Sequence, residues 1–132
     1  MNNKVIYLSR NEFKQLRFNS GTKIVIIDGE KINTWNDYSS LIANKFEFPY
    51  REEAISDYNQ YADWMTDLSW IAQDEQIAIV FFHFSELLKN NSVEKSTLID
   101  IFTEDILPFW EEEVEHVVVG GKKRSFNVYC VD

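Results

Sequence analysis

Three segments of the chain, residues 23–27, 77–84 and 126–131, are dominated by β-branched, aliphatic and aromatic residues. None alternates strictly between apolar and polar positions, which is typical of strands buried on both faces of a parallel sheet. The first segment ends at Asp28-Gly29, a strong turn signal. We therefore expect three buried strands, of which residues 77–84 form the central one.

Between these strands, apolar positions recur at helical spacing. A helix is predicted to begin after Thr34, a residue type that caps helix N-termini, and to stop before Pro49. Residues 57–70 predict a second helix. Strands alternating with helices indicate a small three-layer α/β domain, with a mainly parallel sheet covered by helices on both faces. The residues expected on the core side of the second helix are Tyr58, Tyr61, Ala62, Met65 and Leu68.

Two more helices are expected before the last strand. Ser85 is expected to cap a short helix over residues 85–90, and Ser96 a longer one over residues 96–110, which Pro108 would kink or end. Residues 115–126 then either form a hairpin through Gly120-Gly121 or cross over loosely to the last strand.

The N-terminal part is the least determined by its pattern. Residues 4–9 have the composition of a short strand, and residues 10–18 that of a short helical turn. The sequence leaves open whether they pack as an extension or pair with the sheet. A length of 132 residues suits one domain, which we divide into an N-terminal extension, residues 1–21, and a core, residues 22–132.

Composition and net charge narrow the classes of partner that the protein could bind. A formal charge of −9 disfavours direct contact with nucleic acid or anionic membranes, because phosphates would be repelled, and favours a basic protein partner. The one cysteine, Cys130, allows no intramolecular disulfide and is expected to be a buried thiol. No signal peptide or membrane span is recognisable, so the cytoplasm is the expected location, and the free protein is expected to be a monomer.

The distribution of charge is more informative than its total. No lysine or arginine occurs between Arg51 and Lys89 or between Lys95 and Lys122, while fifteen acids occupy these two intervals. On the helix predicted for residues 57–70, Asn59, Asp63 and Asp67 are spaced by four and would form a polar ridge. A like-charged pair at this spacing costs roughly 0.2–0.5 kcal/mol. Two interpretations stay open: a solvated face, on which Asp57 complements the helix dipole, or a surface for a basic partner.

The same segments resemble the barstar family, small intracellular inhibitors of secreted microbial ribonucleases of the barnase type. The resembling features are DGEKI after a strand, an amphipathic helix followed by FP, and the stretch DYNQYADWMTDLSW. Many relatives carry N-W-D-A-L, then an Asp, then D-L-S-W. Here residues 57–61 occupy the first segment, Asp63 is the following acid, and residues 67–70 match the closing motif. The resemblance implies a parallel three-stranded sheet flanked by helices.

The resemblance also implies a mechanism and a set of contact residues. A ribonuclease cleft that holds phosphate with cations would be occluded by carboxylates on the inhibitor's helix. Asp63 would enter the phosphate site, and Tyr50 and Trp64 would be aromatic anchors at the rim. The complete set of expected partner-binding residues is Asp63, Asn59, Asp67, Glu104, Asp57, Tyr50 and Trp64.

The sequence departs from the family pattern in several places. Asn59 stands where relatives usually have an Asp, and the stretch between Pro49 and Asp57 is about two residues longer than usual. The aromatic–Gly–acid–Asn start of the helix is absent, and residues 1–21 and Gly120-Gly121 look like additions. These departures favour, as an alternative, a barstar-fold binding module for a non-nuclease toxin or regulator.

Other chemistry has weaker support. Glu112 and His116 share one helix face at a spacing that can bind metal, but no second cluster completes such a site, and a solvated run is the simpler interpretation. His83 lies within an apolar strand and is expected to be a satisfied core residue. No nucleophile elbow or phosphate-binding loop is present. We therefore expect no enzyme activity, no cofactor and no metal, with an acid-based enzyme as the remaining alternative.

Overall fold

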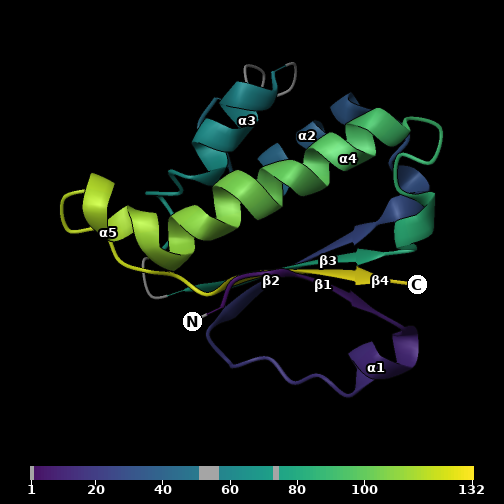
Figure 1. Cartoon of the computed structure of the whole chain (residues 1–132), viewed down its shortest axis with the longest axis horizontal. Coiled ribbons are helices and arrows are strands. Elements are labelled where there is room, and N and C mark those ends of the chain that lie inside the picture. The colour runs from purple at the N-terminus through teal and green to yellow at the C-terminus, as the bar shows by residue number, and fades with distance from the viewer. Residues whose placement is uncertain (1, 51–56, 73–74) are drawn as a thin grey trace.

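The computed structural model describes residues 2–50, 57–72 and 75–132 (Figure 1). Its strands are β1 (Val5–Leu8), β2 (Thr22–Asp28), β3 (Gln76–Phe82) and β4 (Phe126–Val131). Its α-helices are α1 (Arg10–Lys14), α2 (Trp35–Lys45), α3 (Tyr58–Met65), α4 (Ser92–Ile101) and α5 (Val114–Val117). Short 3-10 turns are η1 (Gly29–Lys31) and η2 (Phe84–Glu86), and π-helical turns are η3 (Phe102–Ile106) and η4 (Phe109–Glu113).

The sheet is parallel throughout, as expected, but it has four strands rather than three, in the order β1-β4-β3-β2. The additional strand is β1, from the N-terminal extension, which pairs with the outer edge of β4 from Val5↔Val128 to Leu8↔Val131. The Asn3 side chain strengthens this junction, since its amide accepts from Phe126 N at 3.0 Å and donates to Arg124 O at 2.9 Å. The expectation of three strands was wrong because β1 is four residues long and its partner lies at the other end of the chain.

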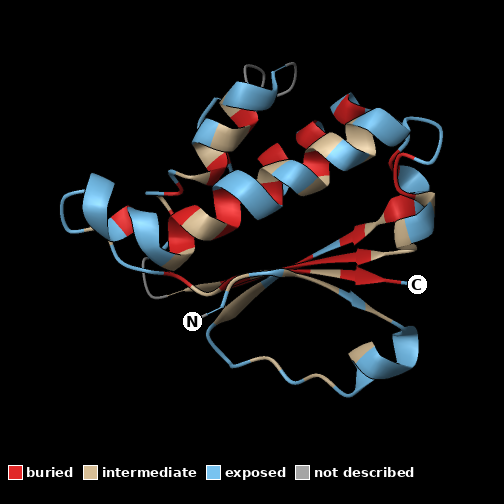
Figure 2. Ribbon diagram, viewed as in Figure 1, coloured by how far each residue is buried: buried red, intermediate tan, exposed pale blue. Residues whose placement is uncertain are grey.

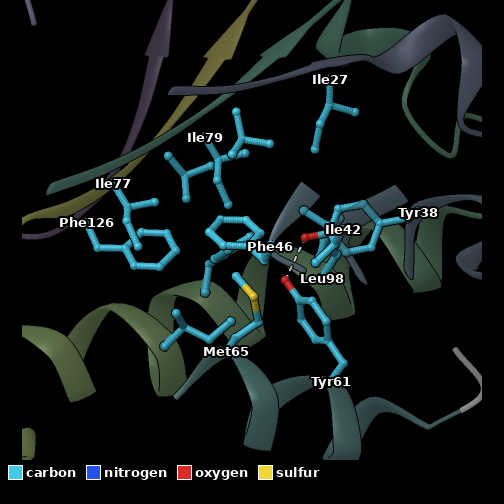
Figure 3. Packing of buried hydrophobic residues seen from close by; sticks show 14 of the residues in the cluster. Ile27, Tyr38, Ile42, Phe46, Tyr61, Met65, Ile77, Ile79, Leu98 and Phe126 are labelled. Carbon is cyan, nitrogen blue, oxygen red and sulfur yellow. Dashed lines mark hydrogen bonds between the residues drawn. The ribbon is translucent and has the colours of Figure 1, made fainter. Parts of the chain in front are cut away.

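One face of the sheet carries the main core. The helices α2, α3 and α4 lie over this face, with the buried residues of the helices turned toward the strands (Figures 1 and 2). Figure 3 shows Ile27, Ile77 and Ile79 of the sheet facing Phe46, Met65 and Leu98 of the helical layer. Tyr38 and Tyr61 meet in this interior through their hydroxyls, 2.6 Å apart.

The other face is covered differently from the prediction. Of the described residues, only the five-residue α1 and the non-helical segment after it lie there (Figure 1). Phe13 packs on Phe82 and Tyr129, with ring centroids 5.3 and 6.4 Å apart. Toward the edge strand β2 the cover is incomplete, since Ile24 and Ile26 are 43% and 54% exposed. The third layer is therefore an irregular N-terminal segment rather than a set of helices.

The helix boundaries agree with the sequence prediction in part. Thr34 caps α2 in a capping box with Asp37, as predicted. Ser96 does not begin a helix, because α4 begins at Ser92, and Ser85 lies within a short 3-10 turn. Pro108 does not end the long helix. It lies between the π-helical turns η3 and η4, which accommodate the proline and let the helix continue to α5.

Residues 118–125 form a crossover to β4, not a hairpin, because β4 pairs with β3 and β1 in parallel. Within the described ranges, no helix has the length and apolar composition that a membrane crossing requires.

Candidate functional site

The helix α3 turns one side to the core and the other to solvent. Tyr61 and Met65 are fully buried, whereas Asp63, between them in sequence, is exposed. The N-cap of α3 is Asp57, whose Oδ1 accepts a hydrogen bond from Asn59 N at 2.8 Å. Asp57 thus has a structural role at the helix start, although it remains exposed.

The helix ends earlier than expected. The last helical residue is Met65, and Thr66 turns back to donate its hydroxyl to Ala62 O at 2.8 Å. Leu68 is fully buried with a φ of 48°, which reverses the chain. Asp67 therefore lies in a turn, where its Oδ1 accepts from Ser69 N at 3.3 Å, and the predicted three-residue helical ridge is wrong in its last member.

Asp63 and Asp67 nevertheless share a surface. A shallow depression is lined by Gln60, Asp63, Trp64 and Asp67. Gln60 was missed from the sequence, although its position three residues before Asp63 places it on the same side of the helix. The depression is the centre of the site, which we call the α3 face and define by these four residues.

An aromatic platform borders the α3 face. The ring of Trp64 lies 6.1 Å from that of Tyr50 and 5.6 Å from that of Trp70. Trp70 is fixed in turn by its indole N–H, which donates to Phe46 O at 2.6 Å. Tyr50 is 63% exposed, so a large part of its ring is available to a partner. The structure thus brings the two predicted aromatic anchors together beside Asp63.

Glu104 is separate from the depression. It is exposed on η3, the segment whose Phe102 packs against Tyr61 with ring centroids 6.4 Å apart. A second tie joins the long helix to α3, since Trp110 donates its indole N–H to Met65 O at 2.9 Å. Glu104 therefore lies on an element packed directly against α3, outside the four residues of the α3 face.

The carboxylates of this surface form no ion pair within the described part of the structure. Among the described residues, the ion pairs involve only Asp28, Glu30, Glu86 and Glu115. Asp57, Asp63, Asp67 and Glu104 take part in none of them. The absence of lysine and arginine in these stretches of sequence is thus matched by an absence of ion pairs within the described part of the structure.

A polar cluster that the sequence did not predict lies at the C-terminal ends of β2 and β3. His83, expected in the core, follows β3 with a φ of 51° and is partly exposed. Its Nδ1 lies 2.9 Å from Asp28 Oδ1, and its Nε2 lies 2.8 Å from the guanidinium of Arg10. Because arginine can only donate, the contact with Arg10 assigns Nε2 as the acceptor, and Nδ1–H then donates to Asp28. Gly29 permits this corner, since a Cβ there would lie 2.3 Å from His83 O.

The cluster does not fit a metal. Ligand atoms of Asp28, Glu30 and His83 lie within 4.8 Å of one another. However, the Arg10 guanidinium occupies the free ring nitrogen and would repel a cation at that position. Glu112 and His116, the spacing noted in the sequence, are both exposed and contribute to no such group among the described residues. The polar cluster is a structural tie between α1 and the ends of β2 and β3.

The family model described as barstar (barnase inhibitor) matches residues 22–120, most of the chain. The chain belongs to the barstar family. A search of the curated proteins and one of the solved structures returned no match.

The match to the barstar model begins at β2 and ends before β4, so β1 and α1 lie outside it. It includes the whole α3 face, the platform residue Tyr50, and Glu104.

Proposed function

We propose that this barstar-family protein is an inhibitor that binds a basic microbial ribonuclease-type toxin and occludes its active site with the α3 face. The observation that carries the proposal is Asp63: an exposed carboxylate on a rigidly packed helix, beside an exposed aromatic platform, with no ion pair in the described structure. The protein would act in the cytoplasm by blocking access alone, with no chemical step and no cofactor of its own.

The physical basis is mimicry of the substrate's charge. A ribonuclease cleft concentrates cations that hold phosphate, and two carboxylates at the α3 face offer the same sign of charge. The net charge of −9 adds long-range attraction, which speeds the encounter and makes the association rate depend on salt. Barstar and barnase are the established example of this steering, and the proposal extends its logic to the residues of this chain.

Packing supports binding without rearrangement. The α3 helix is held on its inner side by the Tyr38–Tyr61 hydrogen bond and at its C-terminal end by the bond from Trp110 to Met65 O. A side chain presented on a fixed helix loses little conformational freedom on association. Tyr50 and Trp64 would contribute apolar contact area, as aromatic residues commonly do at interface hot spots.

The test uses the ribonucleases of the source cells as probes and, in a separate run, purified barnase. Wild-type protein, Asp63→Ala and the matched control Asp105→Ala are immobilised, and cell lysate and culture fluid are passed over each at low and high salt. We expect wild type and the control to retain a basic protein that cleaves RNA, and Asp63→Ala to lose it. Asp105 is an exposed acid outside the α3 face. Asp105→Ala therefore changes the net charge by the same amount as Asp63→Ala without altering the α3 face.

A second candidate rests on Asn59. The residue is exposed in the first turn of α3, where an inhibitory carboxylate is usual in the family. A weaker charge there suits a target other than a ribonuclease, namely a non-nuclease toxin or a regulator. Capture of one protein without RNA-cleaving activity by wild type, and its loss in Asp63→Ala, would favour this candidate.

A further inference from the structure

A groove adjoins the α3 face on the side of the long helix. Its lining includes Asp67 and Ser69 from the turn after α3, and Val118, Gly121 and Lys122 from the crossover to β4. Trp110 also lines it. Asp67 belongs to both surfaces, so the groove is continuous with the α3 face.

The crossover wall of the groove is held in place. Gly121 packs so closely against the long helix that a Cβ would lie 2.4 Å from Val114 O. Val118 N donates to Val114 O at 3.1 Å, and Gly121 N donates to Val118 O at 2.9 Å. The chain then returns to the helix, where Arg124 N donates to Trp110 O at 2.9 Å. Because the crossover is already ordered in this way, it would lose little conformational entropy when a partner binds.

The segment that contributes Val118 to the groove is unusually apolar for a surface turn. Val117, Val118 and Val119 are 67%, 46% and 105% exposed, in consecutive positions. Single exposed valines need no explanation, but a run beside an apolar groove is typical of an interaction site. Figure 2 shows this end of the molecule, around α5, as largely exposed.

The charge of the groove differs from that of the α3 face. Lys122 is exposed and lines the same groove as Asp67, and within the described residues the two form no ion pair. Lys122 ends a stretch of 26 residues without a cation that follows Lys95. A partner crossing from the α3 face into the groove therefore meets carboxylates first, and then valines beside an ammonium group.

We infer that this groove receives an apolar side chain next to a carboxylate from the rim of the same ribonuclease whose cleft the α3 face blocks. The inference rests on the proposed function and adds selectivity to it. Phosphate-binding clefts are alike among ribonucleases, so the α3 face would recognise the class. The rims differ, and the groove would select the individual enzyme.

The test uses uncharged replacement residues, so that no variant gains a carboxylate that could itself attract a basic enzyme. The probe is the ribonuclease retained in the capture experiment, with barnase as a second probe. Val118→Asn removes the apolar contact, and Lys122→Met removes the ammonium group. Val93→Asn is the matched control for the first, since Val93 is 78% exposed at the start of α4, at the other end of the long helix (Figure 1). Lys14→Met on α1 is the control for the second.

The sign of the Lys122→Met effect is decisive. If only the α3 face contacts a basic enzyme, deleting a cation leaves affinity unchanged or raises it, because long-range repulsion falls. Docking in the groove predicts the opposite: Val118→Asn and Lys122→Met should each raise Kd by about fivefold to tenfold, mainly through faster dissociation, while both controls stay at wild type. Urea unfolding of each variant confirms that the fold is intact.

The outcomes separate this inference from the function on which it rests. If Asp63→Ala abolishes binding while Val118→Asn and Lys122→Met bind like wild type, the groove inference is wrong and the inhibitor proposal stands. If Asp63→Ala binds like wild type, or no ribonuclease is retained, both fail. A concentration-dependent dimer of the free protein that Val118→Asn abolishes, measured by sedimentation, would assign the groove to a second copy and also overturn the inference.

Discussion

The hydroxyl groups of Tyr38 and Tyr61 lie 2.6 Å apart in the interior, and both side chains are fully buried (Figure 3). The pair joins α2 to α3, the helix that carries Asp63. Burial raises the pKa of both phenols, so both stay neutral and one donates to the other. The position of the α3 face is thus fixed from beneath by a polar contact within an apolar layer.

Replacing one of the two tyrosines by phenylalanine should lower the free energy of unfolding more than replacing both. Tyr61→Phe leaves the Tyr38 hydroxyl buried without its partner, and we expect the free energy of unfolding to fall by about 1–2 kcal/mol. The double variant Tyr38→Phe/Tyr61→Phe should recover most of that loss, because no unsatisfied group remains. Urea unfolding of the four proteins measures the coupling. Strictly additive losses would show that the hydrogen bond contributes nothing.

Restoring a carboxylate on α3 should strengthen the inhibitor. Asn59→Asp adds an acid one turn before Asp63 and should raise the association rate for a basic ribonuclease several-fold at low salt, with the gain shrinking at high salt. The like-charged spacing costs roughly 0.2–0.5 kcal/mol, which the helix N-terminus offsets. Stopped-flow association at several salt concentrations checks this. A gain independent of salt would contradict the electrostatic explanation.

The N-terminal segment should be needed for stability rather than for binding. Phe13→Ala removes a partly buried ring that packs on Phe82 and Tyr129, and we expect a loss of about 2 kcal/mol, less than the ~3–5 kcal/mol of a fully buried ring. The control Val93→Ala should have little effect, since Val93 is exposed. Chemical unfolding gives the stability, and affinity for the ribonuclease should be unchanged. An affinity loss without destabilisation would place this segment in the interface.

The sequence predicted elements where local and tertiary preferences agree. Thr34 and Asp37 make a capping box whatever surrounds them, and the apolar run of β3 can only be buried. The start of α4 was missed because its first turn is held by distant groups. Glu94 accepts from Trp35 N at 3.0 Å, and Lys95 Nζ donates to Phe84 O at 2.7 Å. No residue within that turn signals these contacts.

The candidate site, like the secondary structure, could be predicted from the sequence in part. The exposure of Asp63 follows from helical periodicity, and Tyr50 and Trp64 were proposed through the family resemblance. The placement of Asp67 depends on the left-handed turn at Leu68, which the sequence does not mark with a glycine. The groove depends on where the crossover folds back, so the basic residues near its end could not be placed beside Asp67 from the sequence.

The buried thiol should be inert in the native protein. Burial raises the pKa of Cys130 to about 12, so almost no thiolate, the reactive form, exists at neutral pH. We expect no labelling by iodoacetamide or a disulfide reagent at pH 7.5 until urea unfolds the chain, with labelling then complete. Mass spectrometry over a urea series measures both. Rapid labelling without denaturant would show that the C-terminal end of β4 opens readily, since Cys130 is buried there.

The contribution of Asp28 to stability should depend on pH. The hydrogen bond from His83, followed by that from Glu30 N, lowers the pKa of Asp28 below its ordinary value near 3.8. A carboxyl with a lowered pKa in the folded state stabilises the protein above its unfolded pKa, and this stabilisation disappears as pH falls through the folded pKa. The stability difference between wild type and Asp28→Asn should therefore be constant near neutrality, begin to shrink as pH falls toward the unfolded pKa near 3.8, and vanish only below the lower folded pKa.

The His83→Asn variant identifies the donor responsible. Asparagine tolerates the left-handed backbone at position 83, where φ is 51°, so the turn should persist while the imidazole is lost. The pKa of Asp28, followed by NMR at its carboxyl carbon, should then move up toward its ordinary value, because the largest cause of its depression is removed. An unchanged pKa would instead assign the depression to the Glu30 backbone N–H, 3.0 Å from the carboxylate, and would show that His83 matters through its bond to Arg10.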